Sequence, residues 1–310
     1  MRQAVGMKLL LRPALTATLG AVVCAAVAVL RAPGWGVAWP AGSVLLTALV
    51  LVPLALTLLV ERNDPPAIAL QLERATRLHL PAALALAAAY YLVPGAVAGL
   101  LVLPWFLTTV LLAVVAVRRM ARHGGSRPLD RLVSDAALLW LTAGAACALA
   151  ERLGVAPALA GAAAHFHQQG FVLLLLTALV ARRDPESRGL ARVLVALTLA
   201  IPGVALGEIL ARLGAGPAVL QAASAALGLA AFVVAVLHVR LAGERQLAFW
   251  QRVGFTVAGA SLALGSVLAA FAAVRGNAPA WPLLAPALQG IGSGLVGLLS
   301  WRAARSSGTL

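Results

Sequence analysis

Charged residues are scarce in this chain: Asp, Glu, Lys and Arg together make up 11% of its 310 residues. Soluble globular domains carry about 25% charged residues, whereas this chain is 62% hydrophobic with a mean hydropathy of +0.96. This composition excludes a soluble catalytic module, a nucleic-acid reader and a disordered tail. The chain is therefore predicted to be an integral membrane protein whose function lies within the bilayer.

Cysteines and acidic residues are also few. The two cysteines, Cys24 and Cys147, lie in apolar runs, which excludes a disulfide framework and a cysteine-based zinc site. Lys and Arg number 24 against 10 Asp and Glu, a net charge of +14, which in a soluble chain would suggest a polyanion such as DNA. Here membrane topology explains the basic excess, and no nucleic-acid partner is predicted.

Apolar segments of spanning length follow one another along the whole chain, separated by short loops. A hydrocarbon core about 30 Å thick needs about 20 residues of helix. The predicted spans lie near residues 14–30, 41–60, 78–92, 97–117, 133–151, 157–181, 191–211, 216–239, 253–274 and 280–301. An amphipathic stretch over 67–77 predicts a short interfacial helix before the third span. The predicted fold is an all-α, polytopic membrane helix bundle of about ten transmembrane helices.

The basic residues alternate between loops in the way that the positive-inside rule requires. With both termini cytoplasmic, 20 of the 24 Lys and Arg residues fall on the cytoplasmic side. The other four, Arg31, Arg152, Arg212 and Arg275, each open an outer loop. A missed or added helix would invert every later loop, so this pattern supports the predicted topology.

The chain reads as a single membrane domain, 1–310, built of five helical hairpins at about 1–61, 62–119, 120–182, 183–241 and 242–310. Two outer turns share the frame Arg-Leu-Gly-x-x-Pro, at Arg152 to Pro157 and Arg212 to Pro217. Gly tolerates left-handed backbone and Pro suits a first helical position, so the frame predicts a helix end followed by a helix start. Common ancestry of the hairpins and convergent turn chemistry both account for it.

The sixth predicted helix carries the densest group of polar residues: His165, His167, Gln168 and Gln169. Polar groups inside a span are expensive, so each is a functional candidate. His165 lies about 12 Å along the helix from Pro157, near the midplane. The two histidines point about 200° apart on a regular helix, so both reach one metal only if the helix is distorted. They line a substrate or proton path, or else provide hydrogen bonds between helices.

Other polar residues fall at a matching depth or near the helix ends. Trp105 follows Pro104 in the fourth predicted helix, and Gln289 lies in the last. Glu208 lies four residues before Arg212, a spacing that allows an ion pair able to act as a gate.

The remaining polar residues are interpreted as structural. Asp130 and Asp135 flank the inner end of the fifth predicted helix, where negative charge suits a helix N-terminus. His79 and His238 are placed near the cytoplasmic side, and His238 is interpreted as an interface anchor.

The segment His165-Phe-His-Gln-Gln-Gly-Phe171 resembles the His-Phe-His-x-x-Gly-Phe motif of YndJ-like bacterial membrane proteins. Gln289, Gly292, Gly297 and Trp301 agree more weakly with that family's last helix, where Asn stands at the position of Gln289. The resemblance implies a multi-pass protein of the bacterial cytoplasmic (inner) membrane, in a family usually described as transporter-like. It strengthens the importance of the His-x-His helix without naming a reaction.

The leading hypothesis is a membrane transporter of a small or amphipathic molecule. Its predicted substrate-binding residues are His165, His167, Gln168, Gln169, Gln289, Trp105 and Glu208. The alternative is a membrane-embedded enzyme acting on a lipid or isoprenoid, with His165 or His167 as acid, base or ligand to haem or a metal. A structural subunit of a membrane complex is a second alternative, and a homo-oligomer or a complex partner fits the small-residue helix faces. No cofactor is predicted, although haem and a metal ion stay open.

Overall fold

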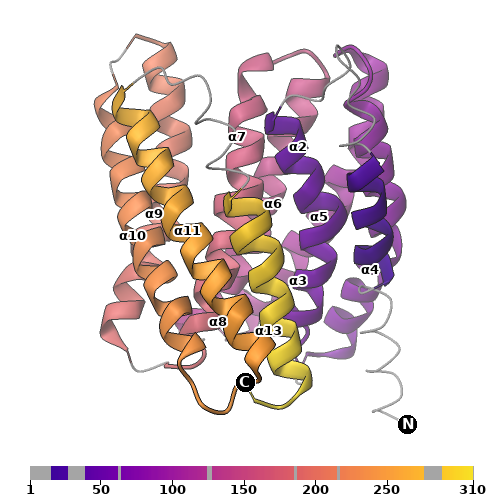
Figure 1. The fold of residues 1–310 in the computed structure, drawn as a ribbon. Helices are drawn as coiled ribbons and strands as arrows, with labels where there is room; N and C mark the ends of the chain where they lie inside the picture. Colours follow the sequence, from indigo (N-terminus) through magenta and orange to yellow (C-terminus); the bar gives the residue numbers. More distant parts are fainter. Residues whose placement is uncertain are drawn as a thin grey trace. The chain divides into compact units, whose positions relative to one another are not determined.

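The computed structural model describes residues 15–26, 39–61, 64–123, 128–184, 187–214, 217–275 and 288–309. These residues are helical or lie in short connections, with no strand among them (Figure 1). Seven of the described helices are long and apolar enough to cross a bilayer, and Leu15–Ala26 forms a shorter apolar helix. The chain is thus an all-helical membrane protein. The count of about ten helices and the orientation of the termini stay predictions. Spans 14–30 and 280–301 lie partly outside the described residues, and the helix that contains span 78–92 is not among the seven.

Contacts divide the chain into two compact units, which are described one at a time. Unit 1 comprises Met1–Arg127 and Asp135–His167, and unit 2 comprises Pro128–Ser134 and Gln168–Leu310. The boundary falls between His167 and Gln168, inside the sixth predicted helix.

Unit 1 contains two packed helix pairs: α4 lies along α5, and α2 contacts α7. Its described elements are α2 (Trp39–Leu46), the π-helix η1 (Thr47–Leu51), α3 (Val52–Leu59), α4 (Pro66–Ala89), α5 (Ala96–His123), α6 (Leu129–Arg152, from Asp135 onward), η3 (Pro157–Leu159) and α7 (Ala160–His165).

Helix α4 differs from its prediction. The sequence suggested an interfacial helix over 67–77 and a separate span over 78–92, but a single helix runs from Pro66 to Ala89. Pro66 starts it, in keeping with the preference of proline for the first helical turn. An ion pair between Glu73 and Arg77, four residues apart, supports the helix in the turn before the expected break.

The two turns of the repeated Arg-Leu-Gly frame have the predicted backbone conformation. Gly154 has φ +78° and Gly214 has φ +83°, both in the left-handed region, and Pro157 opens η3. Arg152 also closes the turn after α4 by donating from Nη2 to the Ala89 carbonyl at 3.1 Å. Its guanidinium lies 5.2 Å from the Tyr90 ring centroid, a cation–π distance.

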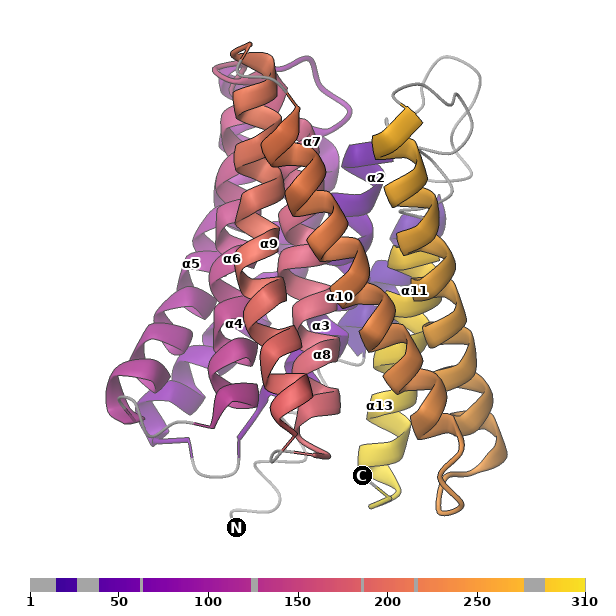
Figure 2. The same ribbon diagram turned by 90° about the vertical axis from the view of Figure 1, so that its left-hand side faces the viewer.

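Unit 2 contains a layer in which α10 packs against both α9 and α11 (Figure 2). Small residues bring these backbones together, since a Cβ on Gly259 would lie 2.6 Å from the Ala235 carbonyl oxygen. The described elements are the π-helix η4 (Phe166–Leu173, from Gln168 onward), α8 (Leu174–Ala181), α9 (Arg188–Arg212), α10 (Ala218–Ala242), α11 (Phe249–Arg275), the π-helix η5 (Leu288–Leu295) and α13 (Val296–Ser306).

Candidate functional site

Three π-helical segments, η1, η4 and η5, interrupt the described helices, and polar side chains gather at them. Short π segments inside α-helices are rare and are frequent at functional sites. Segment η4 contains His167, Gln168 and Gln169, and η5 contains Gln289. The sequence predicted these side chains as candidates but gave no sign of the π winding around them.

In unit 1, the π winding of η1 leaves the Ala48 carbonyl without a backbone donor, so a side chain can bind it. The Val52 N–H bonds to Thr47 O, five residues back, and the next residue, Pro53, has no N–H to offer Ala48 O. His79 of α4 supplies the missing donor, with Nε2 lying 2.7 Å from Ala48 O. His79 is therefore buried within unit 1 and 1% exposed, and its place near the cytoplasmic side stays a prediction.

His167 forms a second buried contact in unit 1. Trp105 of α5 donates from Nε1 to His167 Nε2 at 3.3 Å, and His167 Nδ1 lies 2.7 Å from Ala163 O. The first bond needs a lone pair on Nε2 and the second needs a proton on Nδ1, so together they hold a neutral imidazole in one tautomer. Trp105 also meets the His79 ring edge-on, with centroids 5.4 Å apart.

This bonding bears directly on metal or haem ligation by the His-x-His segment. Because both ring nitrogens of His167 are engaged, a metal would have to displace Trp105. His165 has other surroundings: it is half-buried, and its ring contacts Phe166 with centroids 5.7 Å apart. In the described part of the chain, no group of three or more His, Cys, Asp or Glu side chains is arranged to hold a metal ion.

The glutamines of unit 2 join the other two π segments. Gln169 of η4 donates from Nε2 to Gln289 Oε1 of η5 at 2.6 Å. Gln168 is 6% exposed, and its Nε2 has no hydrogen-bond partner among the described residues. The predicted partnership of the sixth and last helices is therefore present in the structure, although it is made through Gln169.

Unit 2 also contains a tryptophan–histidine pair that the sequence analysis missed. Trp301 of α13 donates from Nε1 to His238 Nε2 at 3.3 Å, and His238 Nδ1 lies 2.9 Å from Val234 O. His238 is 1% exposed, so its interpretation as an interface anchor is wrong. The two residues lie 63 positions apart, and no local sequence pattern links them.

Ion pairs tie down the start of α6 within each unit. In unit 1, Arg119 is buried; it donates to Leu59 O at 3.1 Å, pairs with both Asp64 oxygens, and lies 3.5 Å from Asp135. In unit 2, Arg182 donates to Asp130 Oδ2 at 3.2 Å. Asp130 does lie in the first turn of α6, but both aspartates also serve as partners for arginines that the sequence analysis assigned only to topology.

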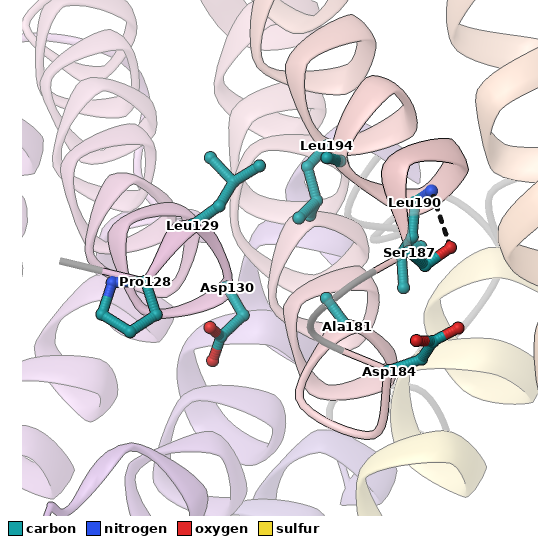
Figure 3. A pocket seen from close by; sticks show the side chains of 9 residues that line it. Pro128, Leu129, Asp130, Ala181, Asp184, Ser187, Leu190 and Leu194 are labelled. Carbon is teal, nitrogen blue, oxygen red and sulfur yellow. Dashed lines mark hydrogen bonds between the residues drawn. The ribbon is translucent and has the colours of Figure 1, made fainter. Parts of the chain in front are cut away.

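A small cavity of about 110 Å³ lies beside Asp130 (Figure 3). It is lined by the start of α6, the end of α8 and the start of α9, including Asp184, Ser187 and Leu194. Asp130 already binds Arg182, and Ser187 Oγ accepts the Leu190 N–H. The side chains that line the cavity are thus mostly apolar or already hydrogen-bonded, and we assign no ligand to the cavity.

Glu208 lies half-buried on α9. The side chain of Arg212 falls outside the described residues, so the expected pair between them stays a prediction.

These features together define a class. An all-helical chain with seven apolar helices of spanning length and with buried imidazoles and amides inside them is a polytopic membrane protein.

The family model of YndJ-like protein matches residues 43–285, which is most of the chain. The chain belongs to the YndJ-like protein family, as the motif around His165 suggested. The match includes η4 and ends before Gln289. No curated protein and no solved structure matches the chain.

Proposed function

We propose that the protein is a transporter of a small or amphipathic molecule in the bacterial cytoplasmic membrane, with its polar site on η4 and η5 of unit 2. The observation that carries the proposal is the 2.6 Å hydrogen bond between Gln169 and Gln289, which joins two π segments inside apolar helices. Discontinuous helices with polar groups near the midplane commonly build transporter sites.

The buried, unsatisfied amide of Gln168 supports this assignment. A buried donor without a partner costs about 1–3 kcal/mol, and Gln168 Nε2 is such a donor among the described residues. A polar substrate that passes the site would accept this hydrogen bond. Gln168, Gln169 and Gln289 carry no charge, so the site suits an uncharged or amphipathic molecule.

The histidines favour transport over the alternative of a membrane-embedded enzyme. A general base needs a free lone pair within reach of substrate, whereas His167 Nε2 accepts from Trp105 and its Nδ1 side faces Ala163 O. His167 therefore acts in packing and orientation beside the glutamine segment. Its role as a metal ligand or acid–base group would require the Trp105 bond to break.

Solvent access to the glutamines tests the proposal without knowledge of the cargo. The chain has only two cysteines, Cys24 and Cys147, so a cysteine-free background needs two substitutions to alanine. Gln168→Cys and Gln289→Cys are then treated with a membrane-impermeant maleimide in right-side-out and in inverted vesicles. A transporter exposes this site to water, so we expect labelling of both positions from at least one side.

A matched position sets the baseline for that experiment. Leu175→Cys lies on α8, seven residues beyond Gln168, at a site that is 0% exposed and surrounded by apolar residues. It should stay unlabelled in both preparations. If Gln168→Cys and Gln289→Cys are as unreactive as Leu175→Cys, the glutamines are packing groups and the transport site is not there.

A further inference from the structure

The first two turns of α11 form a groove that the proposed transport site does not use. Phe249, Arg252, Val253, Thr256 and Val257 line this groove, which has a volume of about 340 Å³. Their spacing of three and four residues places them on one face of the helix. The guanidinium of Arg252 thus lies at the end of a stripe of apolar side chains, to which Thr256 adds a methyl group.

The charge around the groove has one sign. Three arginines are exposed here: Arg240 in the last turn of α10, Arg245 on the connection to α11, and Arg252 in the first turn of α11. None of them pairs with a carboxylate in the described part of the chain. The one acidic side chain on this connection, Glu244, is already bound to Arg183 at 2.6 Å. An anion is therefore the complementary ligand for these arginines.

Two exposed aromatic residues mark the depth of the groove in the membrane. Phe249 is 61% exposed and Trp250 is 77% exposed, with ring centroids 5.0 Å apart. Exposed aromatic side chains beside arginine are typical of the layer where lipid headgroups meet the hydrocarbon. The guanidinium of Arg252 is thus placed at the level of lipid phosphates.

The apolar stripe continues from the groove for the length of an acyl chain. Val253, Val257 and Leu264 are exposed along the same side of α11. The eleven residue steps from Val253 to Leu264 span about 16 Å of helix, which is close to half of the 30 Å hydrocarbon core. A single lipid from one leaflet fits this stripe from headgroup to chain end.

We propose that this groove binds an anionic phospholipid, with its phosphate at Arg252, further attraction from Arg240 and Arg245, and an acyl chain along Val253, Val257 and Leu264. An anionic headgroup matches the unpaired charges, and the apolar stripe requires a ligand with a hydrocarbon chain. The site differs from the glutamine site in its residues, its position on the chain and its ligand. Its test is therefore independent of transport.

Native mass spectrometry of the full-length protein tests the proposal. The protein is released from detergent after addition of equal amounts of phosphatidylglycerol and phosphatidylcholine, and the retained lipids are counted. Wild type should retain phosphatidylglycerol in preference to phosphatidylcholine. Loss of one arginine near an anionic lipid surface corresponds to about a five-fold loss of affinity. Arg252→Gln should show this loss for phosphatidylglycerol alone, and Arg252→Lys should restore most of it.

Arg192→Gln is the matched control, because Arg192 is another exposed arginine but lies on α9, away from the groove. It should leave lipid retention unchanged. Val257→Gln interrupts the apolar stripe and should lower retention of both lipids while preserving the charge.

Two results would overturn the lipid site. In the first, wild type shows no preference for phosphatidylglycerol, or Arg192→Gln and Arg252→Gln reduce it equally. In the second, Arg252→Gln dissolves a dimer that phosphatidylglycerol does not displace, in which case a second copy of the chain is the occupant. All variants change exposed side chains, and a melting temperature within a few degrees of wild type verifies that each is folded.

Discussion

Among its described residues, each unit contains one buried tryptophan–histidine pair, and the two pairs are bonded in the same way. Trp105 donates to His167 in unit 1 and Trp301 donates to His238 in unit 2, both at 3.3 Å. In both, histidine Nδ1 faces the carbonyl four residues earlier on its own helix, Ala163 O or Val234 O. The indole thus satisfies the one nitrogen that the helix leaves open.

The third ring of each cluster makes the difference. In unit 1 it is His79, whose Nε2 binds the carbonyl released by η1 and whose Nδ1 has no hydrogen-bond partner among the described residues. In unit 2 it is Phe255, 5.3 Å from Trp301 between centroids. The same bonding is therefore used in a polar and in an apolar setting. A buried histidine in a membrane helix does not by itself indicate chemistry, and its neighbours decide its role.

Removal of either indole should have the largest effect. Trp105→Ala leaves a cavity and an unsatisfied His167 Nε2, and truncation of a buried tryptophan lowers the free energy of unfolding by about 3–5 kcal/mol. Trp301→Ala should cost somewhat less, because Trp301 contacts one imidazole where Trp105 contacts two. Unfolding by sodium dodecyl sulfate, followed by circular dichroism, measures both.

Trp250→Ala is the control for those variants. Trp250 is 77% exposed, so its loss should change the free energy of unfolding by no more than about 0.5 kcal/mol. A similar small change for Trp105→Ala would show that the indole–imidazole pair of unit 1 does not hold the helices together.

A smaller effect is expected when the imidazole of unit 1 is pushed from its place. A Cβ on Gly144 would lie 2.6 Å from His167 Nδ1 and 3.1 Å from Phe166 Cβ. Gly144→Ala should therefore displace the ring and cost about 1–3 kcal/mol, as overpacking does. The same unfolding assay detects this, and in the Gly144→Ala background Trp105→Ala should cost less than in wild type, because its partner has already moved.

Gly297→Ala provides the matched change in unit 2. Its Cβ would lie 3.3 Å from a Leu176 methyl group and 3.5 Å from Ala258 Cβ, which a small side-chain shift can accommodate. We expect a cost below about 1 kcal/mol and no coupling to Trp301→Ala. Additive costs for Gly144→Ala and Trp105→Ala would contradict the role of Gly144 in seating His167.

The sequence predicts the helices well because the bilayer imposes a simple rule of length and hydropathy. It fails at α4, where polar residues between 67 and 77 resembled a separate interfacial helix, although the helix continues through them and through Pro81 to Ala89. His79 lies near the middle of this single helix and is buried. The sequence analysis also misses η1, because its π winding depends on the missing N–H of Pro53 and on a donor from another helix, His79 of α4.

The candidate site is predictable in its residue types and less so in its pairings. Matching depth in different spans correctly associated Trp105 with the sixth helix and Gln289 with its glutamines. Which neighbour bonds, His167 rather than His165 and Gln169 rather than Gln168, depends on the rotation of each helix. A π segment changes that rotation by adding a residue to the turn, so regular helical spacing gives the wrong face.

The smallest predicted effect compares the two turns that share the Arg-Leu-Gly frame. Gly154 of unit 1 has φ +78° and Gly214 of unit 2 has φ +83°. A Cβ on Gly214 would meet no atom within 4 Å, and one on Gly154 would approach only Pro94, at 3.9 Å. The cost of alanine is then the left-handed backbone alone, about 1 kcal/mol at each position.

Equal losses in the free energy of unfolding for Gly154→Ala and Gly214→Ala, measured by the same assay, would show that the two turns have the same structural role in the two units. Asparagine adopts left-handed backbone more readily than alanine, so Gly154→Asn and Gly214→Asn should recover part of the loss. A cost well above 1 kcal/mol at Gly154 alone would mean that the Arg152 clamp on Ala89 and Tyr90 depends on this turn. The two turns would then share a sequence frame but differ in function, just as the two tryptophan–histidine clusters share their bonding but differ in their third ring.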